Sequence, residues 1–215
     1  MDCNVRRQLM WVPWVAVLAG VGFLTNSFGQ TTPNYPSMKL AVPYLCQYGP
    51  PGDKDHTKNC GQACSAMLAG YYYNFTPSSS AITNENAWLA KVLKDSRYKD
   101  PNGYYTNFEN RNALGKLLTD YWGLKYSAQS GRDVATILNE LKRGRPVIVC
   151  VTISSGTIGT TGDPHWACAI GWNKNSAKII VNDPGSKFGS SKEIPVATFD
   201  KSWALQKRLM APVYR

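Results

Sequence analysis

The sequence predicts an α+β protein in which the helices come first and an antiparallel sheet follows. Apolar residues recur at helical spacing up to Arg143, whereas short apolar segments separated by turns fill the rest of the chain. The 215 residues are 43% hydrophobic and 12% aromatic, which suits the core of one domain and excludes a disordered or collagen-like chain. Because helices and strands are segregated along the chain, we expect N-terminal helices packed on a C-terminal sheet.

Four stretches combine the helical pattern with start and stop signals. In the first, Cys60, Cys64 and Met67 fall on one face, and Gly123 and Gly144 end the last two. The predicted helices cover residues 60–72, 82–93, 108–121 and 133–143.

Five later stretches have the composition of strands. They cover residues 146–153, 165–172, 178–182, 193–199 and 208–214. Between the first two, residues 154–164 form a long loop rich in Gly, Ser and Thr that ends directly on a histidine. Loops of this length in a compact domain tend to be either functional or flexible.

The N-terminus has the layout of a secretory signal peptide. A basic start ending in Arg6-Arg7 precedes an uncharged apolar run, and the small residues Ser27 and Gly29 suit positions −3 and −1 of a cleavage site. A retained membrane anchor is the alternative, but the run is shorter than the ~20 residues of a span and contains Pro13. We therefore expect a signal peptide at 1–29, a polar leader at 30–38 and one domain at 39–215. The protein would be secreted or periplasmic, with no stable membrane insertion after cleavage.

The excess of basic residues does not by itself identify a binding partner. Lys and Arg number 24 against 14 Asp and Glu, a net charge of +10, with basic clusters at 91–99 and 142–145. No RRM, KH or zinc-finger pattern accompanies these clusters, so a solvated basic face is expected and no nucleic-acid partner. The chain also contains neither GxGxxG nor GxxxxGK[ST], which argues against a nucleotide enzyme.

The candidate chemistry begins at Cys60. At the first turn of a helix, unpaired backbone N–H groups and the helix dipole stabilise a thiolate, which makes the cysteine nucleophilic. The adjacent Gly61 would let a substrate backbone approach closely. The alternative is that Cys60 and Cys64 are buried small hydrophobic residues or half-cystines, and position alone leaves it open.

A thiolate catalyst needs a base, and the chain has only two histidines, His56 and His165. His56 lies in a segment rich in Pro, Gly and Asp, whereas His165 opens a strand. A hairpin centred between Lys174 and Asn175 places residue 165 opposite residue 184, and therefore Asp183 beside His165. A carboxylate there would orient the imidazole and stabilise its charged form. A structural histidine and a simple turn at 182–185 remain the alternatives.

Several short motifs follow one another in a fixed order. They read Val42-Pro43-Tyr44-Leu45-Cys46-Gln47, Cys60-Gly61-Gln62-Ala63-Cys64-Ser65-Ala66-Met67-Leu68, Gly144-Arg145-Pro146-Val147, 165–172 and Asp183-Pro184. In this order the chain resembles the papain-like cysteine peptidases of the C39-like group, related to the domain that trims leader peptides after a double glycine. The family pattern gives the first motif as a short strand.

The resemblance implies a papain-like fold and a cysteine peptidase that cleaves a peptide or protein through a thioester intermediate. It implies Cys60 as nucleophile, His165 as general base and then acid, and Asp183 as the orienting group. Gln47 would donate a side-chain N–H to the oxyanion hole, beside the backbone N–H of Cys60. An inactive peptide-binding module and a transglutaminase-type acyltransferase are the alternatives. No cofactor is implied.

The remaining cysteines allow two disulfides in an oxidising compartment. Removal of Cys3 with the signal leaves Cys46, Cys60, Cys64, Cys150 and Cys168. One free nucleophile and two bridges would account for this odd number, with Cys150 paired to Cys168 and Cys46 to Cys64. Four reduced core cysteines are equally compatible with the sequence.

His56, Cys60 and Cys64 follow one another at four-residue spacing, which resembles the spacing of metal ligands. Structural zinc usually takes four ligands with closely spaced cysteine pairs. The spacing here is too loose, so no metal is expected.

Overall fold

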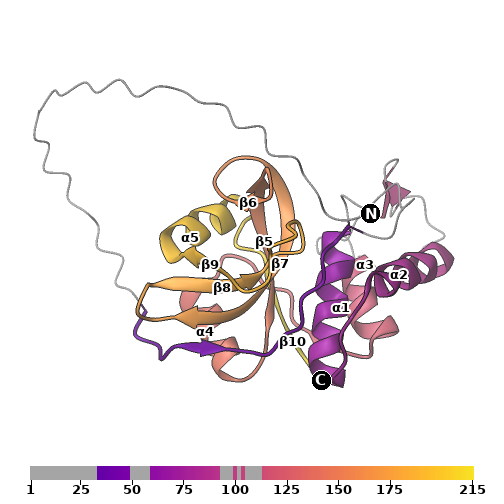
Figure 1. Ribbon diagram of the computed structural model, residues 1–215, viewed down its shortest axis with the longest axis horizontal. Helices are drawn as coiled ribbons and strands as arrows, with labels where there is room; N and C mark the ends of the chain where they lie inside the picture. Colours follow the sequence, from indigo (N-terminus) through magenta and orange to yellow (C-terminus); the bar gives the residue numbers. More distant parts are fainter. Residues whose placement is uncertain (1–32, 49–58, 93–98, 101–102, 105–112) are drawn as a thin grey trace, which may run out of the picture.

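The computed structural model describes residues 33–48, 59–92, 99–100, 103–104 and 113–215. The predicted signal peptide at 1–29 and His56 lie outside these ranges. Within them, an eight-stranded sheet lies between two groups of helices (Figure 1). None of the helices in the described part of the chain combines the length and the apolar character needed to span a membrane. The α+β, papain-like architecture predicted from the sequence is confirmed.

One group of helices contains α1 (Cys60–Tyr73), α2 (Ser79–Val92), α3 (Ala113–Lys116) and a π-helical turn η4 (Leu117–Tyr121). Every residue of α1 from Gly61 to Gly70 is buried, because small and apolar side chains let neighbours pack closely around it. The helix ends at Asn74, which adopts the left-handed conformation and returns its N–H to the carbonyl of Gly70.

The main path of the sheet runs β4-β10-β5-β7-β8-β9. Its strands are β4 (Lys125–Tyr126), β5 (Val147–Ser154), β7 (Asp163–Asn173), β8 (Lys178–Asn182), β9 (Lys192–Pro195) and β10 (Met210–Tyr214). The short strand β1 (Met38–Lys39) pairs with β7, and β6 (Thr157–Ile158) pairs with β5. A separate two-stranded sheet joins β2 (Lys99–Asp100) to β3 (Gly103–Tyr104). All these pairings are antiparallel.

Both faces of the sheet are covered. Alternate residues of β5 point to opposite faces, so Ile148 and Cys150 belong to the core under α1, whereas Val147 and Val149 belong to a second core. That second core lies under α4 (Val134–Lys142) and α5 (Val196–Leu205), on the side of the sheet away from α1 (Figure 1). The predicted strand 146–153 therefore reads as continuously apolar because it is buried on two sides.

The four predicted helices are present, with α2 starting at Ser79 rather than Ile82 and with 108–112 outside the described residues. The predicted strand 193–199 is wrong beyond Pro195, where α5 begins. Its buried residues Phe199, Ser202 and Trp203 have helical spacing and pack on the sheet, which outweighs the local β propensity.

Two shorter segments also differ from expectation. The predicted loop 154–164 contains β6, which makes a tight hairpin with the end of β5. Residues 42–47 form no regular strand, although Leu40 donates its N–H to the carbonyl of Ile170 at 2.8 Å and so starts this segment along β7.

The β7–β8 pairing is shifted from the predicted register. Cys168 lies opposite Asn182 and Trp172 opposite Ile179, with an irregularity between Ala169 and Gly171. Ile170 stays on the α1 side of the sheet with Trp166 and Cys168, whereas the extra residue of this bulge moves Trp172 into the α4–α5 core. The shift leaves the end of β8 close to the start of β7.

Candidate functional site

Cys60 is the first residue of α1, and it is partly buried. Asn59 precedes it as the N-cap residue and makes no side-chain hydrogen bond to the first turn. The thiol therefore lies at the positive end of a 14-residue helix, as the sequence predicts. A thiol at that position is disposed to lose its proton.

His165 and Asp183 lie side by side in the protein interior. The imidazole Nε2 and the Asp183 Oδ1 are 2.8 Å apart, and the two side chains are 5% and 0% exposed. The thiol of Cys60 is hydrogen-bonded to the same imidazole, which leaves Nδ1 for the sulfur. The structure thus brings the three predicted residues together in one buried chain of hydrogen bonds.

The Asp183 carboxylate has two more partners. Its Oδ1 accepts the N–H of Gly185 at 3.0 Å, and its Oδ2 accepts from the Lys192 ammonium at 2.9 Å. A Cβ on Gly185 would lie 3.0 Å from Cε1 of His165, so the glycine leaves room for the imidazole. A fully buried carboxylate with three hydrogen bonds is well satisfied and fixed in orientation.

The mutual contacts change the pKa of each group. Burial lowers the pKa of His165, but Asp183 and Cys60 overcome it and raise the pKa from 6.5 to about 9. Burial raises the pKa of Cys60, yet the hydrogen bond and charge of His165 leave it below the ordinary value. Burial also opposes ionisation of Asp183, but the bonds and charges of His165 and Lys192 keep its pKa lowered. The arrangement favours a thiolate–imidazolium pair beside an ionised carboxylate.

The segment that carries Gln47 is fastened to the Asp183 turn. Gln47 is buried, and its backbone N–H donates to the carbonyl of Pro184 at 2.9 Å. The hydroxyl of Tyr48 donates to the Gly185 carbonyl at 3.2 Å, and that of Tyr44 to the Asp183 carbonyl at the same distance. The motif that supplies Gln47 therefore lies beside the third member of the site.

A polar network that the sequence did not predict holds the start of α1. The Asn86 side chain, on α2, accepts from Gln62 Nε2 at 2.8 Å and donates to Asn59 Oδ1 at 3.1 Å. These hydrogen bonds fix the side chains of Asn59 and Gln62, which lie on either side of Cys60 in the sequence. No motif marks Asn86, since only the packing of α2 on α1 brings it there.

Glu85, the residue before Asn86 on α2, has a buried carboxyl group. Glu85 is fully buried, and its Oε1 accepts from the Ser65 hydroxyl at 2.8 Å and from the Trp122 indole at 2.6 Å. Burial raises the pKa of Glu85 well above its ordinary value, although both hydrogen bonds lower it. Burial therefore favours the neutral form of Glu85, whose hydrogen bonds join α1 and α2 to Trp122 at the end of η4.

Neither predicted disulfide is present. No disulfide joins any of the described cysteines, which are Cys46, Cys60, Cys64, Cys150 and Cys168. Cys168 Sγ instead lies 3.9 Å from the carbonyl oxygen of Cys64, because the face of β7 that bears it packs on α1. Cys150 is opposite Trp166 rather than Cys168 in the β5–β7 ladder. The reduced alternative left open by the sequence is the arrangement found.

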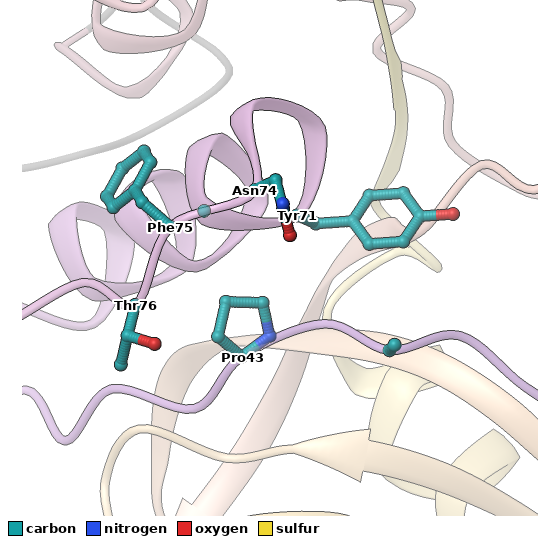
Figure 2. Close-up of a pocket in the computed structure, with 7 residues that line it drawn as sticks. Pro43, Tyr71, Asn74, Phe75 and Thr76 are labelled. Atoms are coloured by element: carbon teal, nitrogen blue, oxygen red, sulfur yellow. The ribbon is translucent and has the colours of Figure 1, made fainter.

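The described residues contain no cluster of three or more His, Cys, Asp or Glu side chains suited to a metal ion. A cavity of about 250 Å³ lies at the far end of α1 from Cys60, around the turn that follows the helix. Figure 2 shows Asn74, Phe75 and Thr76 on this turn, with Pro43 below it and the ring of Tyr71 extending away to the right. Because a 14-residue helix is roughly 21 Å long, this cavity is separate from the Cys60 site.

Comparisons with known proteins identify the family of the chain and support its fold. Residues 39–210 match the family described as Peptidase_C39 like family. The uncharacterised protein YvpB of Bacillus subtilis (strain 168) is 22% identical over 173 residues, covering 70% of this chain and 67% of that protein. A crystal structure of a candidate C39-like peptidase from Bacillus anthracis has a TM-score of 0.56 at 17% identity, covering 84% of this chain and 98% of that chain; it supports the fold alone. The chain belongs to the Peptidase_C39 like family.

Proposed function

We propose that the protein is a cysteine peptidase that hydrolyses peptide bonds through Cys60, His165 and Asp183. The observation that carries the proposal is the continuous hydrogen-bonded chain from the thiol through the imidazole to a buried carboxylate, at the N-terminus of α1. A nucleophile, a base within hydrogen-bond reach and a group that orients the base are what thiol-dependent acyl transfer requires.

In the acylation half of the reaction, the Cys60 thiolate attacks the carbonyl carbon of the scissile amide. The oxyanion of the tetrahedral intermediate would accept hydrogen bonds from the Gln47 side-chain amide and the Cys60 backbone N–H. The His165 imidazolium then gives its proton to the leaving amine, and collapse of the intermediate leaves a thioester on Cys60. Asp183 keeps the imidazole oriented throughout.

In the deacylation half, neutral His165 takes a proton from water, and the resulting hydroxide attacks the thioester. The thiolate leaves, the imidazolium is restored, and the acid product departs. The acceptor in this step separates a peptidase from a transglutaminase-type enzyme, in which an amine would replace water.

We further propose that the domain acts after export, as a secreted or periplasmic protein released by cleavage after Gly29. The support is the basic start, the apolar run and the small residues of the N-terminal sequence. Mass spectrometry of the mature protein is expected to find Gln30 at the N-terminus. An N-terminus at Met1 would contradict the proposal.

The peptidase proposal is tested first by labelling the intact protein with iodoacetamide at pH 7 and mapping the adducts by mass spectrometry. Cys60 should react at least tenfold faster than a model thiol, and His165→Ala should abolish this excess. Cys46 is a useful internal comparison, since it is also partly buried and forms no disulfide.

The second test incubates the wild type and Cys60→Ala with a library of peptides and identifies new termini by mass spectrometry. Cleavage by the wild type alone supports the peptidase. A reactive Cys60 without cleavage, but with transfer of acyl groups to an added amine, favours the acyltransferase. A Cys60 no more reactive than a model thiol favours the inactive binding module, and cleavage by Cys60→Ala overturns the mechanism.

A further inference from the structure

Lys192, on β9, makes two hydrogen bonds at the Cys60–His165–Asp183 site. Its ammonium donates to Asp183 Oδ2 at 2.9 Å and to the carbonyl of Gly156 at 3.0 Å, and its side chain is 22% exposed. The other carboxylate oxygen, Oδ1, is 2.8 Å from the His165 imidazole. One carboxylate therefore carries two cationic partners, one on each oxygen.

The second contact of Lys192 reaches the tip of the β5–β6 hairpin. Ser154 pairs with Thr157, so Ser155 and Gly156 form a two-residue turn, and both have positive φ, 49° and 75°. A Cβ on Gly156 would lie 3.7 Å from the carbonyl oxygen of Gly185. Gly185 itself lies against the imidazole of His165, so Gly185 separates the 155–156 turn from the imidazole.

We propose that Lys192 is a positioning residue of this site: its ammonium shares the Asp183 carboxylate with His165 and fastens the 155–156 turn beside it. The inference rests on the proposed function of the site, because it assigns Lys192 a role in that same chemistry. The ion pair between Lys192 and Asp183 is not an exposed surface pair, since the Asp183 side chain is fully buried.

The shared carboxylate has an electrostatic consequence. The titratable groups around the Asp183 carboxylate come from three elements: Cys60 and Cys64 on α1, His165 on β7 and Lys192 on β9. Two cations on one carboxylate repel each other, so Lys192 makes the imidazolium proton easier to remove. His165 must give that proton to a leaving amine, and the repulsion keeps the proton transferable.

The test is an NMR titration of the histidine ring protons in the full-length protein. The chain has only His56 and His165, and the variant His165→Gln assigns the two signals. The titration is repeated for Lys192→Met, for Lys192→Gln, which keeps a donor without the charge, and for Lys192→Arg, which keeps the charge. Lys178→Met is the matched control, because Lys178 pairs with Glu193 on the protein surface at 3.4 Å.

We expect the His165 pKa to rise by about 0.5 or more in Lys192→Met and Lys192→Gln. It should stay at the wild-type value in Lys192→Arg and Lys178→Met. A lysine that served only to hold the fold together would give the opposite sign, because a loosened site lets the His165 pKa fall back toward 6.5. A downward shift or no shift therefore overturns the inference. If Lys192→Met does not fold, the comparison of Lys192→Gln with Lys192→Arg decides the question.

The positioning of the turn is measured by hydrogen–deuterium exchange of a peptide covering 154–158. Exchange should be at least fivefold faster in Lys192→Met than in wild type and unchanged in Lys178→Met. Equal rates in all three proteins would refute the claim that Lys192 holds the 155–156 turn in place. Neither measurement needs a substrate, so a protein that cleaves no peptide fails the proposed function and still returns a result on Lys192.

Discussion

The substitution Asp183→Asn isolates the charge that stabilises the His165 imidazolium. Asparagine has the size of aspartate, so the buried position stays filled, and its side-chain oxygen can still accept from the imidazole. What is lost is the negative charge 2.8 Å from His165, together with the oxygen that accepts from Lys192 at 2.9 Å. We expect His165 to lose most of its tendency to hold a proton at neutral pH.

The size of the effect follows from the pKa of His165. A rise from 6.5 to about 9 corresponds to roughly 3 kcal/mol in favour of the charged form, at ~1.36 kcal/mol per unit. Burial opposes the rise, and Asp183 and Cys60 together produce it. Without the Asp183 charge the His165 pKa should fall by at least ~1 unit, or about 1.4 kcal/mol. Because the imidazolium stabilises the thiolate, the Cys60 pKa should rise in turn.

Two measurements check this. NMR titration reports the His165 pKa directly, and the pH dependence of iodoacetamide alkylation reports the pKa of Cys60. Asp200→Asn is the matched control, since Asp200 also pairs with a cation, accepting from Arg208 at 3.0 Å. If Asp183→Asn leaves the His165 pKa within ~0.3 unit of wild type, the carboxylate is not the source of the raised pKa.

Four further predictions concern stability and thiol state. As pH rises above 4.5, the wild type should become progressively less stable than Glu85→Gln, because folding keeps a buried acid with a raised pKa protonated. Urea unfolding at pH 5 and pH 8 measures the difference in free energy of unfolding, and a difference that does not change with pH contradicts the prediction. Asn86→Ala should cost about 1–3 kcal/mol and slow Cys60 alkylation, whereas the exposed Asn84→Ala should change stability by less than ~0.5 kcal/mol; equal effects would refute the role of the network. Gly189→Ala places a Cβ 1.8 Å from the Asp183 carbonyl oxygen and should destabilise by at least ~2 kcal/mol in thermal unfolding, unlike Gly159→Ala, whose nearest contact is 4.0 Å away. Thiol titration of the unfolded, unreduced protein should find every cysteine from Cys46 to Cys168 reactive, and two equivalents fewer would reveal a disulfide.

Local signals in the sequence account for much of the fold. The helix that starts at Cys60 is marked by its apolar spacing, and the helix that ends before Gly144 by its glycine. The strands that begin near His165 and Lys178 are marked by their apolar runs and the turn between them. Local signals failed at 196–199, where β-branched residues suggested a strand. The contacts of Phe199 and Trp203 with the sheet make this segment a helix, and such contacts lie beyond the reach of a local pattern.

The sequence alone was enough to predict the candidate groups of the site. It placed Cys60 at a helix start, left His165 as a base at a strand start, and put Asp183 near His165 through a short hairpin, because these relations depend on residues close together in the chain. Packing in three dimensions was needed to show that Cys60 contacts His165, that Lys192 and Asn86 make hydrogen bonds beside these residues, and that the described cysteines form no disulfide. Those contacts join elements far apart in the sequence, and they depend on how α1, α2 and β9 pack around the sheet.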